Sequence, residues 1–346
     1  MKYLFVLGRN TELSIEEIKG YLEKIGNNVL NNYSKENGLI LELENPLERN
    51  VIDCLGGTIS IGEIIADKIS DLDSKEIYGG VKNNLAYTIL NICGNQEELK
   101  EYLRLRFKQE KIRASFKPIH NSPKVTEEYF CFENYIGRII QKCDYKSIEE
   151  RDMKKPVRRE SLAISPRLAK IMINLSQVKE NQTLLDPFCG IGVILQETLL
   201  QNIKVIGIDK DKDAINGARK NLEWFKFSKK EYQLFNIDSR KCELAKADVI
   251  VTEPHLGEIL KKSPSKSKAK KILESFEDLI INVLNNLKKK VNKRIVFTSP
   301  LILTEKKRIG CDIGKITSKT KLKQILNEID DFREGQVVGR RIFVLE

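Results

Sequence analysis

The sequence predicts an α/β protein whose C-terminal half is an open sheet of mostly parallel strands, preceded by smaller α+β domains. From residue 184 to residue 253, short apolar segments with strand character alternate with helical or loop crossovers. Four of these segments end in an acidic residue: Asp186, Asp209, Asp238 and Glu253. Ligands of open α/β sheets bind beyond the carboxyl ends of the strands, so the four carboxylates predict a binding site at one edge of the sheet.

The first of these strands leads into a turn that contains Gly190 and Gly192, and then into an apolar helical run over residues 193–200. A strand, a glycine turn and a helix in this order form the first half of a nucleotide-binding unit. The two glycines would let the backbone approach a ligand where a Cβ atom would collide. The third glycine of a dinucleotide fingerprint is missing, so a purely structural tight turn is the alternative interpretation.

The second strand, Lys204–Asp209, also ends in an acid. An acid at the tip of the second strand is where folds of this kind hold the ribose hydroxyls of an adenosine. A helix with apolar residues at helical spacing is predicted next, over residues 213–225. Any one of the four acids could instead cap a helix or lie in a solvated loop.

The segments Asp186-Pro-Phe-Cys-Gly-Ile-Gly, Asp209, Asp238 and Glu253-Pro-His-Leu-Gly resemble the successive motifs of S-adenosylmethionine-dependent methyltransferases. The most similar family is the THUMP-domain tRNA guanosine N2-methyltransferases of archaea and eukaryotes, with bacterial relatives. The resemblance implies a Rossmann-like class I methyltransferase sheet with an antiparallel edge near residues 337–345. It also implies S-adenosylmethionine as cofactor, tRNA as partner and guanosine 10 as the methylated nucleotide. The implied cofactor-binding residues are Asp186, Phe188, Gly190, Gly192, Asp209 and Asp238.

The fourth motif departs from the family pattern Asp-Pro-Pro-Tyr, because it reads Glu253-Pro254-His255-Leu256. In the family, the acid and the first proline carbonyl accept the protons of a base amine, and the aromatic ring stacks on the flipped base. The resemblance therefore implies Glu253, Pro254 and His255 as catalytic residues. Glutamate is one methylene longer than aspartate, and the position of the aromatic ring is aliphatic here. Glu253 as a structural acceptor in a tight loop, and His255 as a cap of that loop, are the alternatives.

Composition points to a cytoplasmic protein with a polyanionic partner. The chain has 60 Lys and Arg against 49 Asp and Glu, a net charge of +11, which favours a nucleic acid as partner. A Lys-rich surface that reflects biased genome composition is the alternative. The seven cysteines form no Cys-x-x-Cys pair, so reduced thiols and no metal site are predicted. No apolar run reaches the length of a membrane span.

Four regions are predicted along the chain. They are a small α+β domain at 1–70, a THUMP-like α+β domain at 75–145, a charged linker at 146–160 and the methyltransferase domain at 161–346. In the first, Ser14 and Glu17 predict a capping box that begins a helix. At the start of the last, Ser165 and Pro166 predict a helix that reaches about Leu175.

Basic residues cluster on the helix predicted over 97–108 and on its exit, and the resemblance implies that this domain holds the acceptor end of tRNA. The predicted RNA-binding residues are Arg104, Arg106, Lys111, Arg113 and Lys117. A solvated helix face explains these charges equally well. The lysine-rich segment 261–271, directly after the fourth motif, is predicted to be mobile and to close over bound RNA.

Three functions are compatible with these features. The first is methylation of the exocyclic N2 amine of a tRNA guanosine. The second is methylation of another nucleic-acid amine, such as adenine N6 in DNA or RNA. The third is RNA binding by a protein whose methyltransferase domain is weak or depends on a small activating protein subunit.

Overall fold

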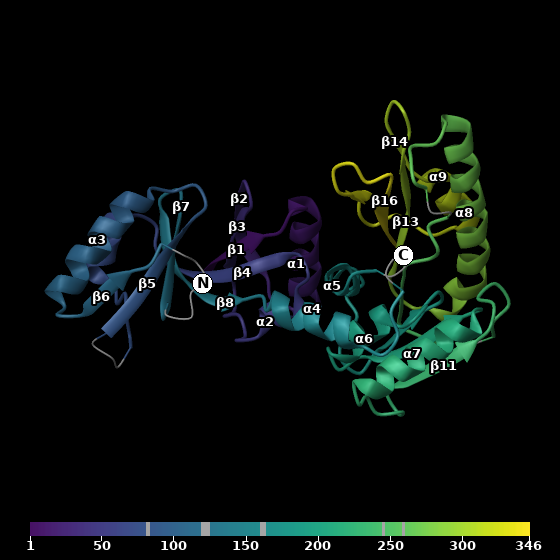
Figure 1. Cartoon of the computed structure of the whole chain (residues 1–346), viewed down its shortest axis with the longest axis horizontal. Helices are drawn as coiled ribbons and strands as arrows, with labels where there is room; N and C mark the ends of the chain where they lie inside the picture. The colour runs from purple at the N-terminus through teal and green to yellow at the C-terminus, as the bar shows by residue number, and fades with distance from the viewer. Residues whose placement is uncertain (81–83, 119–124, 160–163, 244–245, 258–259) are drawn as a thin grey trace. The chain divides into compact units, whose positions relative to one another are not determined.

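The structure is a computed structural model that describes residues 1–80, 84–118, 125–159, 164–243, 246–257 and 260–346. The chain forms two compact units, and it passes from one unit to the other more than once (Figure 1). Unit 1 comprises Met1–Thr11, Asn27–Asp53 and Gly57–Asp144. Unit 2 comprises Glu12–Gly26, Cys54–Gly56 and Tyr145–Glu346.

Unit 1 is built on one eight-stranded sheet with the order β2-β3-β1-β4-β8-β7-β5-β6. Its elements are β1 (Lys2–Leu7), β2 (Val29–Lys35), β3 (Gly38–Leu43), α2 (Val51–Cys54), β4 (Thr58–Ala66), the 3₁₀ helix η1 (Ile69–Ser74), β5 (Asn84–Asn91), α3 (Gln96–Gln109), β6 (Arg113–Phe116), β7 (Glu127–Phe132) and β8 (Tyr135–Lys142). The sheet continues through the regions predicted as separate domains at 1–70 and 75–145, because β4 pairs with β8. The two regions therefore share one sheet in this structure.

The helix predicted over 97–108 is present as α3. Asn95 caps its first turn by accepting a hydrogen bond from the backbone N–H of Glu98, and Leu99, Leu103 and Phe107 face the core. Strand β6 follows α3 and ends at Phe116. Helix α2, which follows Pro46, is a single turn, Val51–Cys54.

Unit 2 contains the predicted open sheet, with the strand order β11-β10-β9-β12-β13-β16-β15 and β14 paired to β13. Its strands are β9 (Thr183–Asp186), β10 (Lys204–Asp209), β11 (Tyr232–Asn236), β12 (Val249–Thr252), β13 (Ile295–Leu303), β14 (Arg308–Ile309), β15 (Ile329–Asp331) and β16 (Val338–Leu345). The five strands from β11 to β13 are parallel, and β16 is antiparallel to β13, as predicted for the last strand.

Helices cover both faces of this sheet. They are α4 (Tyr145–Lys154), α5 (Pro166–Leu175), α6 (Val193–Leu199), α7 (Lys212–Trp224), α8 (Lys266–Leu287), the 3₁₀ helix η2 (Lys288–Lys290) and α9 (Ile313–Thr320). One apolar core contains residues of α5, α6 and α7, and the other contains residues of α8 and α9, which pack against each other (Figure 1). Leu184 belongs to the first core and Leu185 to the second, as expected of successive residues on a strand. The predicted start of α5 is confirmed: Ser165 caps it and Pro166 is its first residue.

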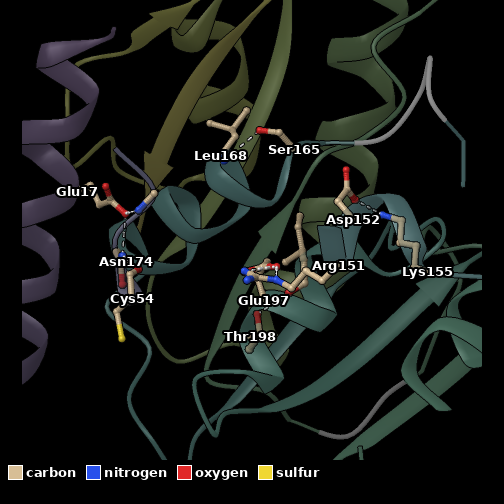
Figure 2. Close-up of polar contacts among 12 residues, drawn as sticks. Glu17, Cys54, Arg151, Asp152, Lys155, Ser165, Leu168, Asn174, Glu197 and Thr198 are labelled. Carbon is tan, nitrogen blue, oxygen red and sulfur yellow. Dashed lines mark hydrogen bonds and ion pairs between the residues drawn. The ribbon is translucent and has the colours of Figure 1, made fainter. Parts of the chain in front are cut away.

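The predicted capping box at Ser14 and Glu17 is wrong, because helix α1 begins at Thr11 and spans Thr11–Ile25. Both residues lie inside the helix, and Glu17 is fully buried in unit 2. Its Oε1 accepts hydrogen bonds from the backbone N–H of Gly56, at 2.7 Å, and from Asn174 Nδ2, at 2.9 Å (Figure 2). An N-terminal helix is thus part of the C-terminal unit.

The segment predicted as a linker at 146–160 contains α4. Arg151 on this helix forms a double hydrogen bond with the buried carboxylate of Glu197 on α6, with a closest distance of 2.8 Å (Figure 2). Removing one partner of such a buried pair leaves the other charge uncompensated. Helix α4 is therefore anchored to unit 2.

We expect Glu17→Ala to destabilise unit 2 by about 2–5 kcal/mol, because two buried donors lose their acceptor. The single tryptophan, Trp224, lies on α7, so its fluorescence during urea unfolding reports on unit 2. Glu17→Gln keeps an oxygen in place and should cost less than half as much. An unchanged tryptophan transition in Glu17→Ala would show that α1 does not support unit 2.

All seven cysteines are free thiols. Among the described residues, no helix combines the length and the apolar composition that crossing a membrane requires.

Candidate functional site

The carboxyl ends of the parallel strands open into a cavity of about 1500 Å³ in unit 2. Residues at the ends of β9, β10, β11 and β12 line it, together with residues of α8 and β16. Eight of the predicted site residues line this cavity: Asp186, Phe188, Gly190, Asp209, Asp238, Glu253, Pro254 and His255. Gly192 is not among the lining residues.

The glycine turn after β9 needs glycines for its backbone conformation. Gly190 and Gly192 have φ values of +51° and +85°, in the region that residues with a side chain rarely adopt. A Cβ atom at Gly190 would meet nothing within 4 Å, whereas one at Gly192 would lie 3.3 Å from the Cβ of Ala218. Gly192 therefore serves the turn and its packing on α7, and Gly190 borders the open cavity.

Asp209, the last residue of β10, braces the same turn. Its Oδ2 accepts a hydrogen bond from the backbone N–H of Gly190, and its Oδ1 accepts one from that of Asp211, both at 2.9 Å. Each carboxylate oxygen has two lone pairs, so, counting the donors in the part of the chain that the structure describes, each keeps one acceptor position. These positions suit two neighbouring hydroxyl groups such as those of a ribose.

Asp238, two residues beyond β11, is paired with Arg240. The side chain and backbone N–H of Arg240 donate to both carboxylate oxygens of Asp238. This hydrogen bonding lowers the pKa of Asp238 to about 2. Both side chains are partly exposed, and exposed ion pairs of this kind contribute little to stability, so a ligand amine can displace Arg240 at low cost.

Asp186, the last residue of β9, is almost fully buried. Its Oδ1 accepts hydrogen bonds from Thr252 Oγ1, at 2.6 Å, and from the backbone N–H of Phe188, at 3.1 Å. Burial raises the pKa of Asp186 to about 7, although the hydrogen bonds from Thr252 and Phe188 oppose this rise. The residue connects β9 to β12 and lines the cavity.

Glu253 follows β12 and forms an ion pair that the sequence did not predict. Arg340 Nε donates to its Oε2 at 2.6 Å, and Arg340 Nη2 donates to its Oε1 at 3.0 Å. Thr298 Oγ1 also donates to Oε2, at 3.3 Å. The side chains of Glu253 and Arg340 are 7% and 21% exposed. Burial lowers the pKa of Arg340, but the hydrogen bonds and the charge of Glu253 outweigh it, and the net pKa is raised.

The residues after Glu253 form the rim of the cavity. Pro254 is buried, and His255 is exposed, with its Nδ1 accepting a hydrogen bond from the backbone N–H of Gly257 at 3.2 Å. An accepting Nδ1 places the proton of the neutral ring on Nε2. Leu256 packs against the core that contains α8.

Comparison with known proteins shows what this unit is similar to. Residues 156–299, which include the glycine turn and the Glu253 loop, match the family described as an RMKL-like methyltransferase domain. Unit 2 has the fold of class I methyltransferases. A second match, over residues 81–220, is to a family described as DNA methylase.

The relatives named tRNA (guanine(10)-N2)-dimethyltransferase include the proteins of two organisms. The protein of Methanothermobacter thermautotrophicus is 38% identical over 117 residues, which are 34% of this chain and 34% of that protein. The protein of Pyrococcus abyssi is 26% identical over 271 residues, which are 74% of this chain and 78% of that protein. The chain is therefore similar in sequence to proteins with this name, over 34% of the length of the first and 78% of the length of the second.

The fold agrees with that of a solved structure. TrmN from Thermus thermophilus has a TM-score of 0.52 with this chain at 13% identity, and the match covers 100% of this chain and 99% of TrmN. The predicted fold class, a Rossmann-like methyltransferase sheet preceded by α+β structure, is confirmed.

The lysine-rich segment after the fourth motif is not a loop over most of its length. Residues 266–271 form the first turns of α8 in the methyltransferase domain, with Ser265 as N-cap. Ala269 is buried, and Lys268 and Lys271 line the cavity. The predicted mobile segment is thus largely a helical wall of the site, because Ala269 packs on the core.

The predicted RNA-binding residues of unit 1 differ in their exposure and in the contacts that their side chains make. Arg104 is exposed and paired with Glu101 on the same helix. The guanidinium of Arg106 binds Glu110 and donates to the carbonyls of Leu72, Asp73 and Lys75, so its side chain holds that loop in place. Lys111 and Arg113 are exposed, and Lys117 is half-buried.

Arg340 and Thr298 are the functional residues that the sequence analysis missed. Arg340 stands in the strand Val338-Gly-Arg-Arg-Ile-Phe-Val-Leu345, where two arginines interrupt an otherwise apolar segment. A charge in a strand that packs in the core requires a partner. That pattern was the available signal, but it does not identify the partner, since Glu253 is 87 residues away.

We expect Asp186→Asn to reduce the loss of stability of the methyltransferase domain as the pH rises. The folded pKa of about 7 lies above the ordinary value of 3.8. The folded state therefore holds a proton that the unfolded chain releases, and this stabilisation is complete below about pH 4 and lost as the pH rises through 7. Asparagine keeps the Oδ1 that both donors use, but it does not ionise.

The difference in unfolding free energy between the variant and the parent should change by roughly 2–3 kcal/mol from pH 5 to pH 8, in favour of the variant at pH 8. Urea unfolding followed through Trp224 measures it. Asp248→Asn serves as control, because Asp248 accepts from the backbone of Thr183 and is not among the residues that line the cavity. Parallel pH profiles of the parent and Asp186→Asn would contradict the assignment.

Proposed function

We propose that this protein transfers a methyl group from S-adenosylmethionine to the exocyclic N2 amine of a guanosine in tRNA, at position 10 as in its named relatives. The proposal rests on one observation, which is that two kinds of group line the same cavity of unit 2. Asp209 and Asp238, placed to hold an adenosine, and Glu253 with Pro254, placed to hold an amine, line the same space.

The size of the cavity supports the binding of a cofactor and a base side by side. Pockets for one small ligand usually measure about 300–1000 Å³, and this cavity of about 1500 Å³ also has room for a base. The ends of β9, β10 and β11 would hold the cofactor, and the loop after β12 would hold the base. Cationic side chains of the wall, Lys268 and Lys271 among them, suit the phosphates beside a flipped nucleotide.

The chain's own residues would align the amine. Bound S-adenosylmethionine supplies an electrophilic methyl group. Glu253 Oε1 and the carbonyl oxygen of Pro254 are the two acceptors for the amine's protons, and accepting both raises the electron density at nitrogen. Holding the nitrogen in one orientation converts an encounter of two molecules into a reaction within one complex. His255 presents a ring and an Nε2–H at the rim, where the base would lie.

Unit 1 would bind the tRNA. Its basic residues Lys111 and Arg113 lie at the exposed end of α3 and on β6. By resemblance this part of unit 1 is the THUMP-like domain, and the protein would work in the cytoplasm. A small activating subunit is a further element of the proposal, tested by whether the purified chain is active alone.

Methylation of adenine N6 is the second candidate, because residues 81–220 match a DNA methylase family. That match ends before the loop that contains Glu253, so it does not include the residues proposed to hold the target amine.

The decisive experiment incubates the protein with tRNA and isotope-labelled cofactor, followed by mass spectrometry of the nucleosides. We expect labelled N2-methylguanosine or its dimethyl form. A matched tRNA with inosine at position 10 lacks only the exocyclic amine and should receive no label there. Labelled N6-methyladenosine would favour the second candidate, and absence of label with every nucleic acid tested would contradict the proposed activity.

The double substitution Lys111→Glu and Arg113→Glu should weaken tRNA binding about ten-fold at physiological salt. If both residues contact phosphates, the slope of log affinity against log salt should become shallower by about 1.5–2. Fluorescence anisotropy at several KCl concentrations measures both quantities. Lys35→Glu with Lys68→Glu makes the same change in net charge at exposed lysines outside the predicted surface. Equal losses in the two double variants would show that only net charge matters.

A further inference from the structure

The ion pair between Glu253 and Arg340 spans three neighbouring strands of the methyltransferase domain. Glu253 follows β12, Thr298 lies on β13 and Arg340 lies on β16, which is antiparallel to β13. Arg340 faces Pro300 in this register, and Thr298 faces Ile342. The glutamate is therefore held by the two strands that lie beyond its own, and both Glu253 and Arg340 line the cavity.

Counting hydrogen bonds shows what remains for a ligand. Oε2 of Glu253 accepts from Arg340 Nε and from Thr298 Oγ1, which fills both of its lone pairs. Oε1 accepts only from Arg340 Nη2. Among the contacts that the described residues make, one acceptor position of this carboxylate is thus open, and it is on Oε1.

The carboxylate of Glu253 must be held in one position if it is to serve as an acceptor for a bound amine. Glutamate has one more rotatable bond than aspartate, so without a partner its carboxylate would sample several positions. The planar fork of arginine matches a carboxylate with two parallel hydrogen bonds and sets both its place and its plane. Lysine would provide the charge without the second hydrogen bond.

We propose that Arg340 is a positioning residue that locks the carboxylate of Glu253 so that the open position of Oε1 faces the target amine. The proposal rests on the proposed methyl transfer to a base amine. It assigns to Arg340 the function of compensating for the extra methylene of Glu253. Glu253 contacts the substrate, and Arg340 acts through it.

The test compares Arg340→Met with Arg341→Met in the full chain. Arg341 is the next residue on β16 and makes the same kind of two-point pair, with Asp330 at 2.6 and 2.9 Å, but it does not line the cavity. Both variants should lower the melting temperature. Arg340→Met should also lower kcat on tRNA by about 10²-fold with little change in KM, since displacing a reacting group by about 1 Å has an effect of that size. Arg341→Met should keep kcat within about two-fold.

Three further measurements separate positioning from loss of structure. Cofactor affinity by calorimetry should be unchanged in Arg340→Met. Arg340→Lys, which keeps the charge and is the variant to use should Arg340→Met not fold, should recover only part of the rate. In a protein that already carries Glu253→Gln, Arg340→Met should lower kcat by less than about three-fold. The effects of residues that act as one unit are not additive.

The possible results distinguish a failure of the proposed function from a failure of the positioning role of Arg340. If the parent protein labels no guanosine amine, the proposed function fails, and with it the basis for assigning Arg340. If the parent is active but Arg340→Met and Arg341→Met have equal kcat, or the effects of Arg340→Met and Glu253→Gln multiply in full, the positioning role is wrong and the methyltransferase assignment is unaffected.

Discussion

Glu253→Gln should lower the rate of tRNA methylation by roughly 10²-fold or more while cofactor affinity stays the same. The variant keeps the length of the side chain but loses the anionic acceptor that we propose for the target amine. It also faces Arg340 with an amide, so one of the two hydrogen bonds from the guanidinium loses its acceptor. We therefore expect a loss of stability of about 1–3 kcal/mol as well, in contrast to the neutral effect that an isolated loop residue would give.

A control variant is needed because the rate and the stability change together. Asp330→Asn breaks the neighbouring pair with Arg341 in the same way, away from the cavity. Single-turnover rates, measured well below both melting temperatures, should fall in Glu253→Gln and not in Asp330→Asn. Methylation at the parent rate by Glu253→Gln would remove Glu253 from the mechanism and leave it as a purely structural partner of Arg340.

The cavity could be predicted from the sequence because its main features are local. Each strand of the parallel sheet is a short apolar run, and the acid at its end follows directly in the chain. Parallel strands bring their carboxyl ends to one edge, so Asp186, Asp209 and Glu253 meet wherever the strands pair. The glycines of the turn were predictable for a similar reason, since their positive φ values are a property of the turn itself.

The missed features depend on pairing between distant segments. The partner of Glu253 is fixed by the antiparallel register of β16 on β13, and no local pattern encodes that register. Glu17 had the spacing of a capping box with Ser14, but the carboxylate satisfies Gly56 and Asn174 instead. Glu17 therefore makes tertiary hydrogen bonds, whereas the local sequence pattern predicts that it caps a helix.

The position of α1 also changes how the protein can be divided. The boundary near residue 146 predicts that the catalytic half stands alone, yet α1 and Cys54–Gly56 belong to the methyltransferase unit. Leu13 of α1 is part of the core that contains α5 and α6. A fragment that begins at residue 146 would expose this core, so the RNA and cofactor sites are better separated by point substitutions.

Asp209→Ala should weaken the binding of S-adenosylmethionine by ten-fold or more. A hydrogen bond from a ligand hydroxyl to a charged group contributes about 1.5–3 kcal/mol, and the open positions of Asp209 suit two such hydroxyls. The substitution also removes the acceptors of the backbone N–H groups of Gly190 and Asp211, so the glycine turn loses a brace. A drop in affinity alone therefore does not show which of the two roles was lost.

Changing the ligand as well as the protein separates these roles. Calorimetry with S-adenosylhomocysteine and with its 2′,3′-dideoxy analogue gives a double cycle with Asp209→Ala. If Asp209 holds the ribose, the dideoxy analogue binds the parent protein at least ten-fold more weakly, and the two ligands bind the variant alike, because the hydroxyls have no carboxylate left to bind. If Asp209 only braces the turn, removing the hydroxyls weakens binding by the same factor in the parent and in the variant. Equal factors would reject Asp209 as the ribose acceptor, and the ribose would then have to be held by another group of the cavity.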